Sequence, residues 1–221
     1  MLPCSIESPR KVAEMSRYIG PRIRIVRRLN GVDLPGLITS RELRRPYPPG
    51  QHGPTQRVKL SDYAVRLREK QKLRYHYGIG EKQFRLYMQK AKRTKGNTGE
   101  NLLILLESRI DNVVFRLGFA RTMRAARQMV LHGHVNVDGE RVNIPSFSLS
   151  VGQTVEIREK SKHRAKVTEG LSGAGQSALP SYLERGDTEL KGIFKTRPES
   201  NDCPIGEITE SLVVELYALS M

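Results

Sequence analysis

Apolar positions in the first half of the chain recur every three to four residues over two stretches, and each stretch predicts an amphipathic helix. The first helix is expected over 61–77, with Ser61 as its N-terminal cap and Gly78 ending it. The second helix is expected over about 81–93. The positions of this second helix that should face a core are Phe84, Met88, Ala91 and either Leu86 or Tyr87.

A longer apolar pattern covers 101–117 and predicts one helix with a broad apolar face, which Gly118 ends. Thr122 then caps a further helix that runs to about His132. Four polar side chains on the outer face of that helix are available to a partner: Arg121, Arg124, Arg127 and Gln128.

The apolar period then changes to two, which predicts strands. Residues 134–137 and 141–144 flank Asp138 and Gly139, a pair that favours a two-residue hairpin turn. A third strand is expected over 154–158. The predicted fold class is therefore α+β: an extended basic N-terminal arm and a helical domain, with an inserted helix–turn–helix–hairpin module.

The two ends of the chain lack this periodicity. Residues 16–57 are expected to be irregular, because the Pro-Tyr-Pro-Pro-Gly run at 46–50 is incompatible with a regular helix or sheet. This arm is either disordered or an extended segment that orders on RNA, and its tyrosines and histidine favour the second reading. A Gly/Ser-rich loop is expected over 170–181 and a strand over 191–195, whereas 212–219 fits either a strand or a short helix.

The net charge is +15, and most of it lies in the first half of the chain. Residues 1–100 hold 23 Lys and Arg against 8 Asp and Glu, whereas residues 166–221 hold 5 against 9. A charge of this size indicates a polyanionic partner, with nucleic acid as the first candidate and an anionic membrane surface as the second. The N-terminal half should supply most of the electrostatic attraction.

Basic residues of the 61–77 helix fall on one stripe at Arg66, Lys70 and Arg74. Such a stripe is usually a solvated helix face. Few acidic residues interleave with it in this sequence, since Glu69 and Glu81 cannot balance their neighbours. Contact with phosphate is therefore the favoured interpretation.

The two cysteines, Cys4 and Cys203, cannot build a zinc site by themselves and suggest no disulfide framework. No apolar run is long enough to cross a membrane, and the first 14 residues lack the apolar core of a signal peptide. We therefore expect no metal, no cofactor and no membrane attachment. Residues 1–15 are either an extension or a start-site artefact.

Two segments resemble the RNA-binding module named after the S-four ribosomal protein: SRIDNVVFRLGF at 108–119 and AARQMVLHGHVNV at 125–137. That module also occurs in several enzymes, so the flanking sequence decides between them. Five flanking segments resemble the bacterial and organellar ribosomal protein itself: YIGPR at 18–22, PGQHG at 49–53, LSDY at 60–63, LREKQK at 67–72 and KGNTGENLL at 95–103. The similarity runs from about Ser16 to Leu219.

This resemblance implies a structural constituent of the small ribosomal subunit. Family members bind the small-subunit rRNA early, near a junction of helices, nucleate assembly of the subunit body and contribute to decoding accuracy. The implied neighbours are the S-five protein and messenger RNA at the entry channel, and some members repress their own messenger RNA. The implied location is the cytoplasm, within a bacterial or plastid ribosome. Some relatives carry a cysteine zinc site near the N-terminus, which this chain lacks.

The expected domains are an arm and helical domain over 16–107, the RNA-binding module over 108–170, and a C-terminal segment over 171–221 that packs back on the body. The residues expected to contact RNA are basic, aromatic or amide side chains of the arm, the helices and the module. They are Tyr18, Arg22, Arg27, Arg28, Arg44, Arg45, Tyr47, His52, Arg57, Arg66, Arg68, Lys70, Lys72, Arg74, Arg109, Arg116, Arg121, Arg124, Arg127, Gln128, His132, His134 and Lys162.

An enzyme is not expected. The Arg109-Ile110-Asp111 triplet faintly resembles the Arg-Leu-Asp of pseudouridine synthases. Asp111 is expected early in a helix, where it can hydrogen-bond and orient Arg109 or a neighbouring turn, and no catalytic domain remains. His132 and His134 have no third partner at metal-ligand spacing, so they are expected to contact RNA or to pack. The other alternative is a free RNA chaperone of stalled ribosomal particles, against which the basic N-terminal half argues.

Overall fold

A computed structural model describes residues 18, 20–29, 31–32, 34, 37, 43, 45–55, 59–172, 179–199 and 208–220. The helices within these ranges are α1 (Arg22–Arg28), α2 (Asp62–His76), α3 (Glu81–Arg93), α4 (Thr98–Glu107), α5 (Ile110–Arg116), α6 (Met123–Leu131), α7 (Arg164–Ser172) and α8 (Glu210–Ser220). The strands are β1 (Val135–Val137), β2 (Glu140–Val142), β3 (Thr154–Ile157), β4 (Leu183–Arg185) and β5 (Lys191–Phe194). The predicted α+β class is confirmed.

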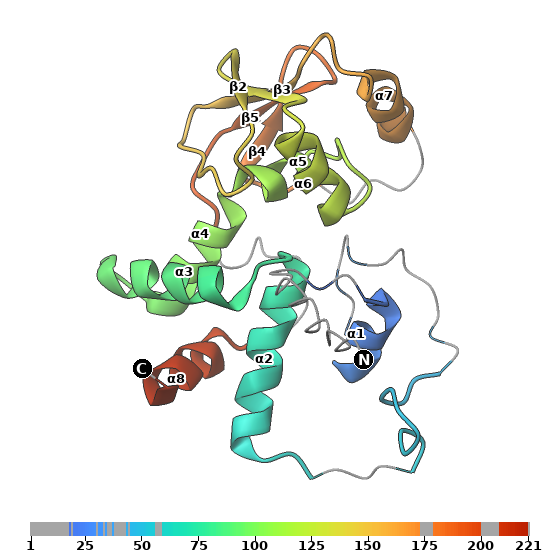
Figure 1. Ribbon diagram of the computed structural model, residues 1–221. Helices are drawn as coiled ribbons and strands as arrows, with labels where there is room; N and C mark the ends of the chain where they lie inside the picture. Colours follow the sequence, from blue (N-terminus) through green and yellow to red (C-terminus); the bar gives the residue numbers. More distant parts are fainter. Residues whose placement is uncertain are drawn as a thin grey trace, which may run out of the picture.

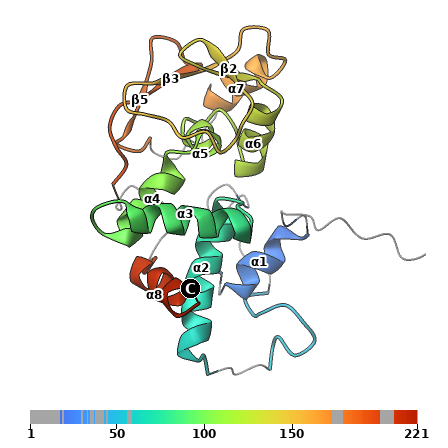
Figure 2. The ribbon, with the colours of Figure 1, turned by 60° about the vertical axis from the view of Figure 1, so that its left-hand side comes forward.

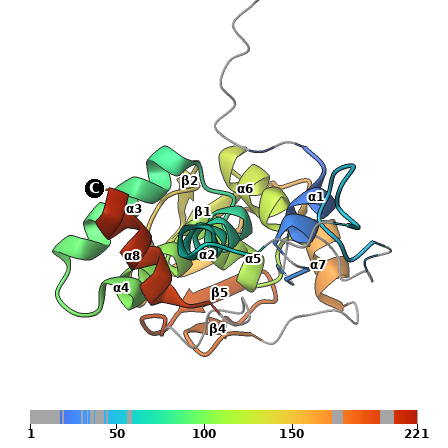
Figure 3. The same cartoon turned by 90° about the horizontal axis from the view of Figure 1, so that it is seen from below.

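The elements form two layers, one helical and one built around the sheet (Figure 1). Helix α2 runs through the helical layer, with α1 on one side of it and α3 and α8 on the other, as Figures 2 and 3 also show. The core of the helical layer includes Leu73, Phe84 and Val213. The core under the sheet gathers Val114 and Val155 among others, packed by α5 and α6.

The sheet has the order β2-β1-β3-β5-β4, and every pair of neighbouring strands is antiparallel. The predicted hairpin is confirmed, because Val135 pairs with Val142 across a turn in which Asp138 and Gly139 have φ angles of 49° and 85°. Two positive φ angles are what a primed two-residue turn requires, and Gly139 adopts its angle without steric cost. The strand predicted over 191–195 is confirmed as β5, which with β4 extends the sheet beside β3.

The prediction of one helix over 101–117 is wrong. Asn97 caps α4, which ends at Glu107, and α5 begins only after an extended Arg109 with ψ 138°. The break is held by the 147–149 segment: the Ile110 amide donates to the Phe147 carbonyl at 2.9 Å, and a second bond joins Leu149 N to the Ser108 carbonyl at 2.8 Å. Hydrogen bonds from a distant segment therefore replace those of a continuous helix.

The prediction that residues 16–57 are wholly irregular is also wrong, because α1 lies within this stretch. Pro21 stands at the N-cap position, where its missing N–H removes no helical hydrogen bond. Ile25 and Val26 are buried in the helical core. Burial of this short apolar stretch, rather than a long periodic pattern, stabilises the helix.

The segment at 212–219, left open between strand and helix, forms helix α8. Val213, Leu216 and Tyr217 are buried, and α8 packs on α2 and α4. Helix α7 and strand β4 were not predicted. None of the helices in the described ranges is long and apolar enough to span a membrane.

Candidate nucleic-acid interface

Four arginines gather around a hollow of about 680 Å³ beside α1. They are Arg24, Arg27, Arg28 and Arg45. The Arg27 guanidinium lies 5.1 Å from the centre of the Tyr47 ring and donates to the Tyr47 carbonyl at 2.9 Å and the Pro48 carbonyl at 3.3 Å. Arg27 thus fixes the 45–55 segment against α1, whereas the other three arginines are exposed.

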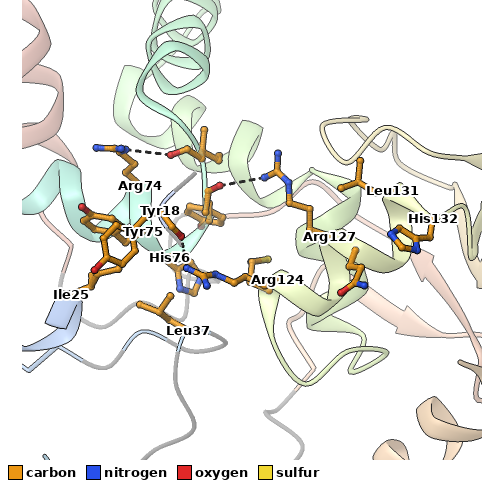
Figure 4. A pocket seen from close by; sticks show the side chains of 15 residues that line it. Tyr18, Ile25, Leu37, Arg74, Tyr75, His76, Arg124, Arg127, Leu131 and His132 are labelled. Atoms are coloured by element: carbon orange, nitrogen blue, oxygen red, sulfur yellow. Dashed lines mark hydrogen bonds between the residues drawn. The ribbon is translucent and has the colours of Figure 1, made fainter. Parts of the chain in front are cut away.

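A second hollow, of about 380 Å³, lies between α1, the end of α2 and α6 (Figure 4). Arg124 and Arg127 of α6 project into it from one side, and Tyr18 and Tyr75 lie on the other. Arg124 donates to the Tyr18 carbonyl at 2.5 Å, and Arg127 donates to the Gly78 carbonyl at 3.3 Å. These bonds aim both guanidinium groups across the hollow toward the helical layer.

The two hollows share Tyr18, Ile25 and Tyr75, so together they form one concave surface, which we call the basic groove. It runs from the arginines beside α1 to the outer face of α6. Both arginine side chains and tyrosine rings line it. This combination suits a polyanion with exposed bases, because guanidinium groups bind phosphate and aromatic rings stack on bases.

Two further polar residues, one just before α6 and one on it, extend the basic groove. Arg121 is exposed and lines a neighbouring hollow against α7, and Gln128 lines both that hollow and the basic groove. The structure therefore brings Arg124, Arg127 and Gln128 together, and Arg121 lies in the neighbouring hollow, just before the Thr122 cap of α6.

Three histidines cluster at the end of α6. The ring centre of His134 lies 6.2 Å from that of His132 and 4.7 Å from that of His163. Slight burial, the other two histidines and the cations Arg141 and Arg158 lower the pKa of His134 below its usual value. Within the described ranges, no group of His, Cys, Asp or Glu could hold a metal ion.

Several predicted RNA-binding residues make intramolecular ion pairs on α2. Arg66 contacts Glu215 of α8 at 2.8 Å, Lys70 contacts Glu81 of α3 at 3.0 Å, and Lys72 contacts Glu69 at 2.6 Å. The balancing carboxylates come largely from other helices. We therefore leave these three cations out of the basic groove. Arg74 also lies near Glu81, at 3.9 Å, but it lines the groove.

Arg109 is buried rather than presented to a partner, since only 1% of it is exposed. Its guanidinium donates to both carboxylate oxygens of Asp111, at 3.0 and 2.7 Å, and to the Tyr87 hydroxyl at 2.6 Å. The expectation that Asp111 orients Arg109 is confirmed. Asp111 also lies 3.7 Å from Arg127, so this buried pair positions a cation of the basic groove.

Arg116 is also buried, with Glu107 as its partner. The two side chains meet at 2.9 Å, and 5% and 1% of them are exposed. The Glu107 carboxylate also accepts from the hydroxyls of Tyr77 at 2.5 Å and Tyr182 at 2.7 Å, and from the Asn112 amide. These five residues form a buried network that joins α2, α4, α5 and the residue before β4. The network holds the two layers of the fold together.

His76 completes the buried network on the groove side. Its Nε2 accepts from the Arg116 guanidinium at 3.2 Å, and its Nδ1 has no hydrogen-bond partner. Burial and the Arg116 charge lower the pKa of His76 to about 3. The ring is therefore neutral at pH 7, with its proton on Nδ1.

This histidine predicts an acid-sensitive fold. The pKa of His76 is 6.5 in the unfolded chain and about 3 in the folded chain. The free energy of unfolding should therefore be unaffected by this histidine above pH 6.5 and should fall as the pH drops from 6.5 toward 3. Between pH 7 and 5 the loss should be about 2 kcal/mol. His76→Gln keeps an acceptor for Arg116. Between pH 7 and 5, its free energy of unfolding in urea titrations should fall by about 2 kcal/mol less than that of the wild type. An equal loss in both proteins would contradict the assignment.

The remaining predicted residues differ in exposure, and two of them lie outside the described ranges. Tyr18, His52 and Lys162 are exposed, and Arg68 is half-buried on α2. Arg22 donates to the Leu37 carbonyl at 3.2 Å. The predicted residues that lie outside the described ranges are Arg44 and Arg57, and both cysteines also lie there.

Sequence reasoning missed three residues of the basic groove. Arg24 lies one helical turn before Arg28 and could have been found from that spacing. Tyr75 and His76 stand near the end of α2, where the sequence offered no signal that two other elements pack against them. Their placement depends on tertiary contacts with α1 and α6.

Comparison with known sequences identifies the family. Residues 17–107 match the family described as ribosomal protein S4/S9 N-terminal domain, and residues 108–155 match the S4 domain. Three relatives are each called small ribosomal subunit protein uS4: those of Geobacillus sp. (strain WCH70), Halalkalibacterium halodurans and Listeria monocytogenes, at 52%, 50% and 49% identity. Each comparison covers 205 residues, 92% of this chain and 100% of the relative.

These matches span both layers of the fold and confirm the resemblance drawn from the sequence motifs. The relatives are bacterial and bear the name of a ribosomal protein, which confirms the interpretation as a ribosomal component rather than an enzyme. The chain belongs to the S-four family of small-subunit ribosomal proteins, whose members carry the S-four RNA-binding domain.

Proposed function

We propose that this chain is a primary rRNA-binding protein that nucleates assembly of the small-subunit body and binds the RNA through the basic groove. The observation that carries the proposal is the continuity of the groove. The two hollows share Tyr18, Ile25 and Tyr75, so one RNA segment can contact the helical layer and α6 together.

The chemistry of the groove suits recognition of RNA shape. Exposed arginines beside α1 can hold phosphates bidentately, and the tyrosines offer ring faces to bases that leave a helix. RNA junctions present both features at close range. A protein that holds them in one fixed arrangement would stabilise the junction early, which is what nucleation of assembly requires.

The proposed RNA-contacting residues are the predicted residues that remain accessible, together with Arg24. Those whose placement supports contact are Tyr18, Arg28, Arg45, Tyr47, His52, Arg74, Arg121, Arg124, Arg127, Gln128, His132, His134 and Lys162. Arg44 and Arg57 remain proposed on sequence grounds alone. The division into domains at 107–108 and 170–171 is likewise a proposal.

The resemblance to the S-four family supports three more specific proposals. The chain contacts the S-five protein, lies beside messenger RNA at the entry channel and contributes to decoding accuracy. Its acidic C-terminal segment, with 5 basic against 9 acidic residues over 166–221, is a poor phosphate-binding surface and leaves that part of the molecule available to a protein neighbour.

Chemical footprinting on bacterial small-subunit rRNA tests the proposal. The wild-type chain should protect a compact set of nucleotides, and changing Arg121, Arg124 and Arg127 together to Ala should remove part of that set. The expected loss of affinity is roughly 10- to 100-fold, from two or three charge-assisted hydrogen bonds.

A matched triple variant at Lys82, Lys90 and Arg93 is the control. These exposed residues lie on α3, across α2 from α1 (Figure 3). Changing all three to Ala removes the same positive charge as the α6 variant but should leave the footprint intact. Unchanged protection by the α6 variant would refute the role of the groove, and absence of any wild-type footprint would refute RNA binding.

A further inference from the structure

We propose that the part of the basic groove between α1, the end of α2 and α6 is a pocket for one unstacked nucleotide of the bound RNA. The proposal rests on the proposed function and names the ligand of one part of that surface. Its evidence is the volume of the pocket, the chemistry of its lining and one buried donor without an acceptor.

The cavity has a volume of about 380 Å³. Ligand pockets of about 300–1,000 Å³ hold single small molecules. A space at the lower end of that range suits one nucleotide rather than a paired segment. The RNA would therefore reach it with a base turned out of its helix, as single-stranded loops and junctions permit.

The wall on the helical side is aromatic. Tyr18 and Tyr75 meet edge to face, with ring centres 5.9 Å apart and planes at 77° (Figure 4). Tyr18 is 38% exposed and lines the pocket, so part of its side chain is accessible to a ligand. Ile25 and Leu37 continue the apolar surface beside it. A flat, apolar ligand face can stack here.

The opposite wall is cationic. Arg124 and Arg127 each donate a hydrogen bond across the pocket, to the Tyr18 and Gly78 carbonyls. Arg127 also lies 3.7 Å from Asp111. The two guanidinium groups held in this way present positive charge to a phosphate at the pocket mouth.

No acidic side chain lines this pocket among the described residues. The lining thus offers aromatic faces and hydrogen-bond donors with positive charge but no carboxylate. A cationic ligand or a basic peptide would be repelled by the arginines and would find no carboxylate in the lining. An aromatic ring joined to an anion matches the lining, and a nucleotide is that combination.

His76 supplies the specific feature on the pocket floor. It is 1% exposed, and its Nδ1–H has no acceptor. A buried donor left without a partner is unfavourable. An acceptor on the nucleotide, such as a base carbonyl or ring nitrogen, would satisfy it with a small movement of the ring. The bound state would then complete the hydrogen bonding of the buried network.

Photochemical cross-linking tests the pocket directly. The full chain is bound to bacterial small-subunit rRNA, irradiated at ultraviolet wavelengths, digested with nuclease and trypsin, and analysed by mass spectrometry. Single-nucleotide adducts are expected on the peptides 18–22 and 75–82, which contain Tyr18 and Tyr75. Adducts confined to other peptides would overturn the pocket.

Affinity measurements supply an independent readout. Tyr18→Ala should weaken rRNA binding roughly tenfold, the effect of one lost base–aromatic stacking contact. Tyr18→Phe should bind within about twofold of wild type, because the ring face is kept. Tyr63→Ala is the matched control, since Tyr63 is 61% exposed at the far end of α2.

The outcomes separate the two proposals. Wild-type affinity for Tyr18→Ala, with wild-type binding intact, overturns the nucleotide pocket and leaves RNA binding through the groove standing. Failure of the wild-type chain to bind rRNA overturns both. A loss shared equally by Tyr18→Phe and Tyr18→Ala also overturns the pocket, because the hydroxyl rather than the ring would then be responsible.

Discussion

Replacing Glu107 by Ala is expected to destabilise the fold by roughly 3–5 kcal/mol, as measured by urea unfolding at pH 7. The change leaves the Arg116 guanidinium buried without its counter-charge. It also removes the acceptor of the Tyr77 and Tyr182 hydroxyls and of the Asn112 amide. An unpaired buried charge together with unsatisfied donors is among the most destabilising changes a core can suffer.

Smaller changes in the same network should destabilise the fold less than Glu107→Ala does. Tyr77→Phe and Tyr182→Phe each remove one hydrogen bond to a charged acceptor and leave the ion pair intact. Each should cost about 1.5–3 kcal/mol. Glu159→Ala is the control. Because Glu159 is exposed, this change should alter the free energy of unfolding by less than about 0.5 kcal/mol. Equal stability of Glu107→Ala and the control would show that the network does not hold the layers together.

The network also bears on the proposed RNA-binding surface. Arg116 and Asn112 belong to α5, Tyr77 to the end of α2, and Glu107 to α4. Helix α6 packs on α5, and two of its arginines face the helical layer across the basic groove. The Glu107 network therefore helps to fix the width of the basic groove, where we propose that an RNA segment binds. We expect the fold and the shape of the groove to depend on the same buried ion pair.

The local sequence pattern was enough to predict those elements that their own sequence stabilises. Helix α3 was predicted with the bounds it has, and the open choice between Leu86 and Tyr87 is settled by exposure, since Leu86 is 56% exposed and Tyr87 is half-buried. The hairpin was predicted because Asp138 and Gly139 favour the required turn. In each of these places, pattern and turn chemistry agree with the tertiary structure.

Prediction failed where a partner lies far along the chain. The break at Ser108 and Arg109 depends on a segment about 40 residues away, and the apolar period of 101–117 continues through it. The ion pair of Arg66 depends on Glu215, 149 residues away. RNA contact by Arg66 stays a prediction, but the sequence pattern did not indicate that another helix would supply a carboxylate partner for it. Spacing alone cannot separate an arginine that binds RNA from one that holds the core.

Changing Arg24, Arg28 and Arg45 together to Ala should lower rRNA affinity about 100-fold near 0.1 M salt without unfolding the protein. These three side chains are exposed and line the hollow beside α1, whereas Arg27 fixes the neighbouring segment and is left in place. If each binds one phosphate, the slope of log affinity against log salt should become shallower by about 2–3. Deleting residues 1–57 would be a poorer test, because it removes Ile25 and Val26 from the helical core.

The matched variant with Lys at the same three positions separates charge from geometry. It keeps the charge, so its salt slope should remain near that of wild type, but it cannot bind phosphate bidentately and should lose some affinity. Thermal unfolding of both variants should match wild type, since all three side chains are exposed. A wild-type slope in the Ala variant would place the phosphate contacts elsewhere on the chain. A shallower slope in the Ala variant alone would assign them to the hollow beside α1.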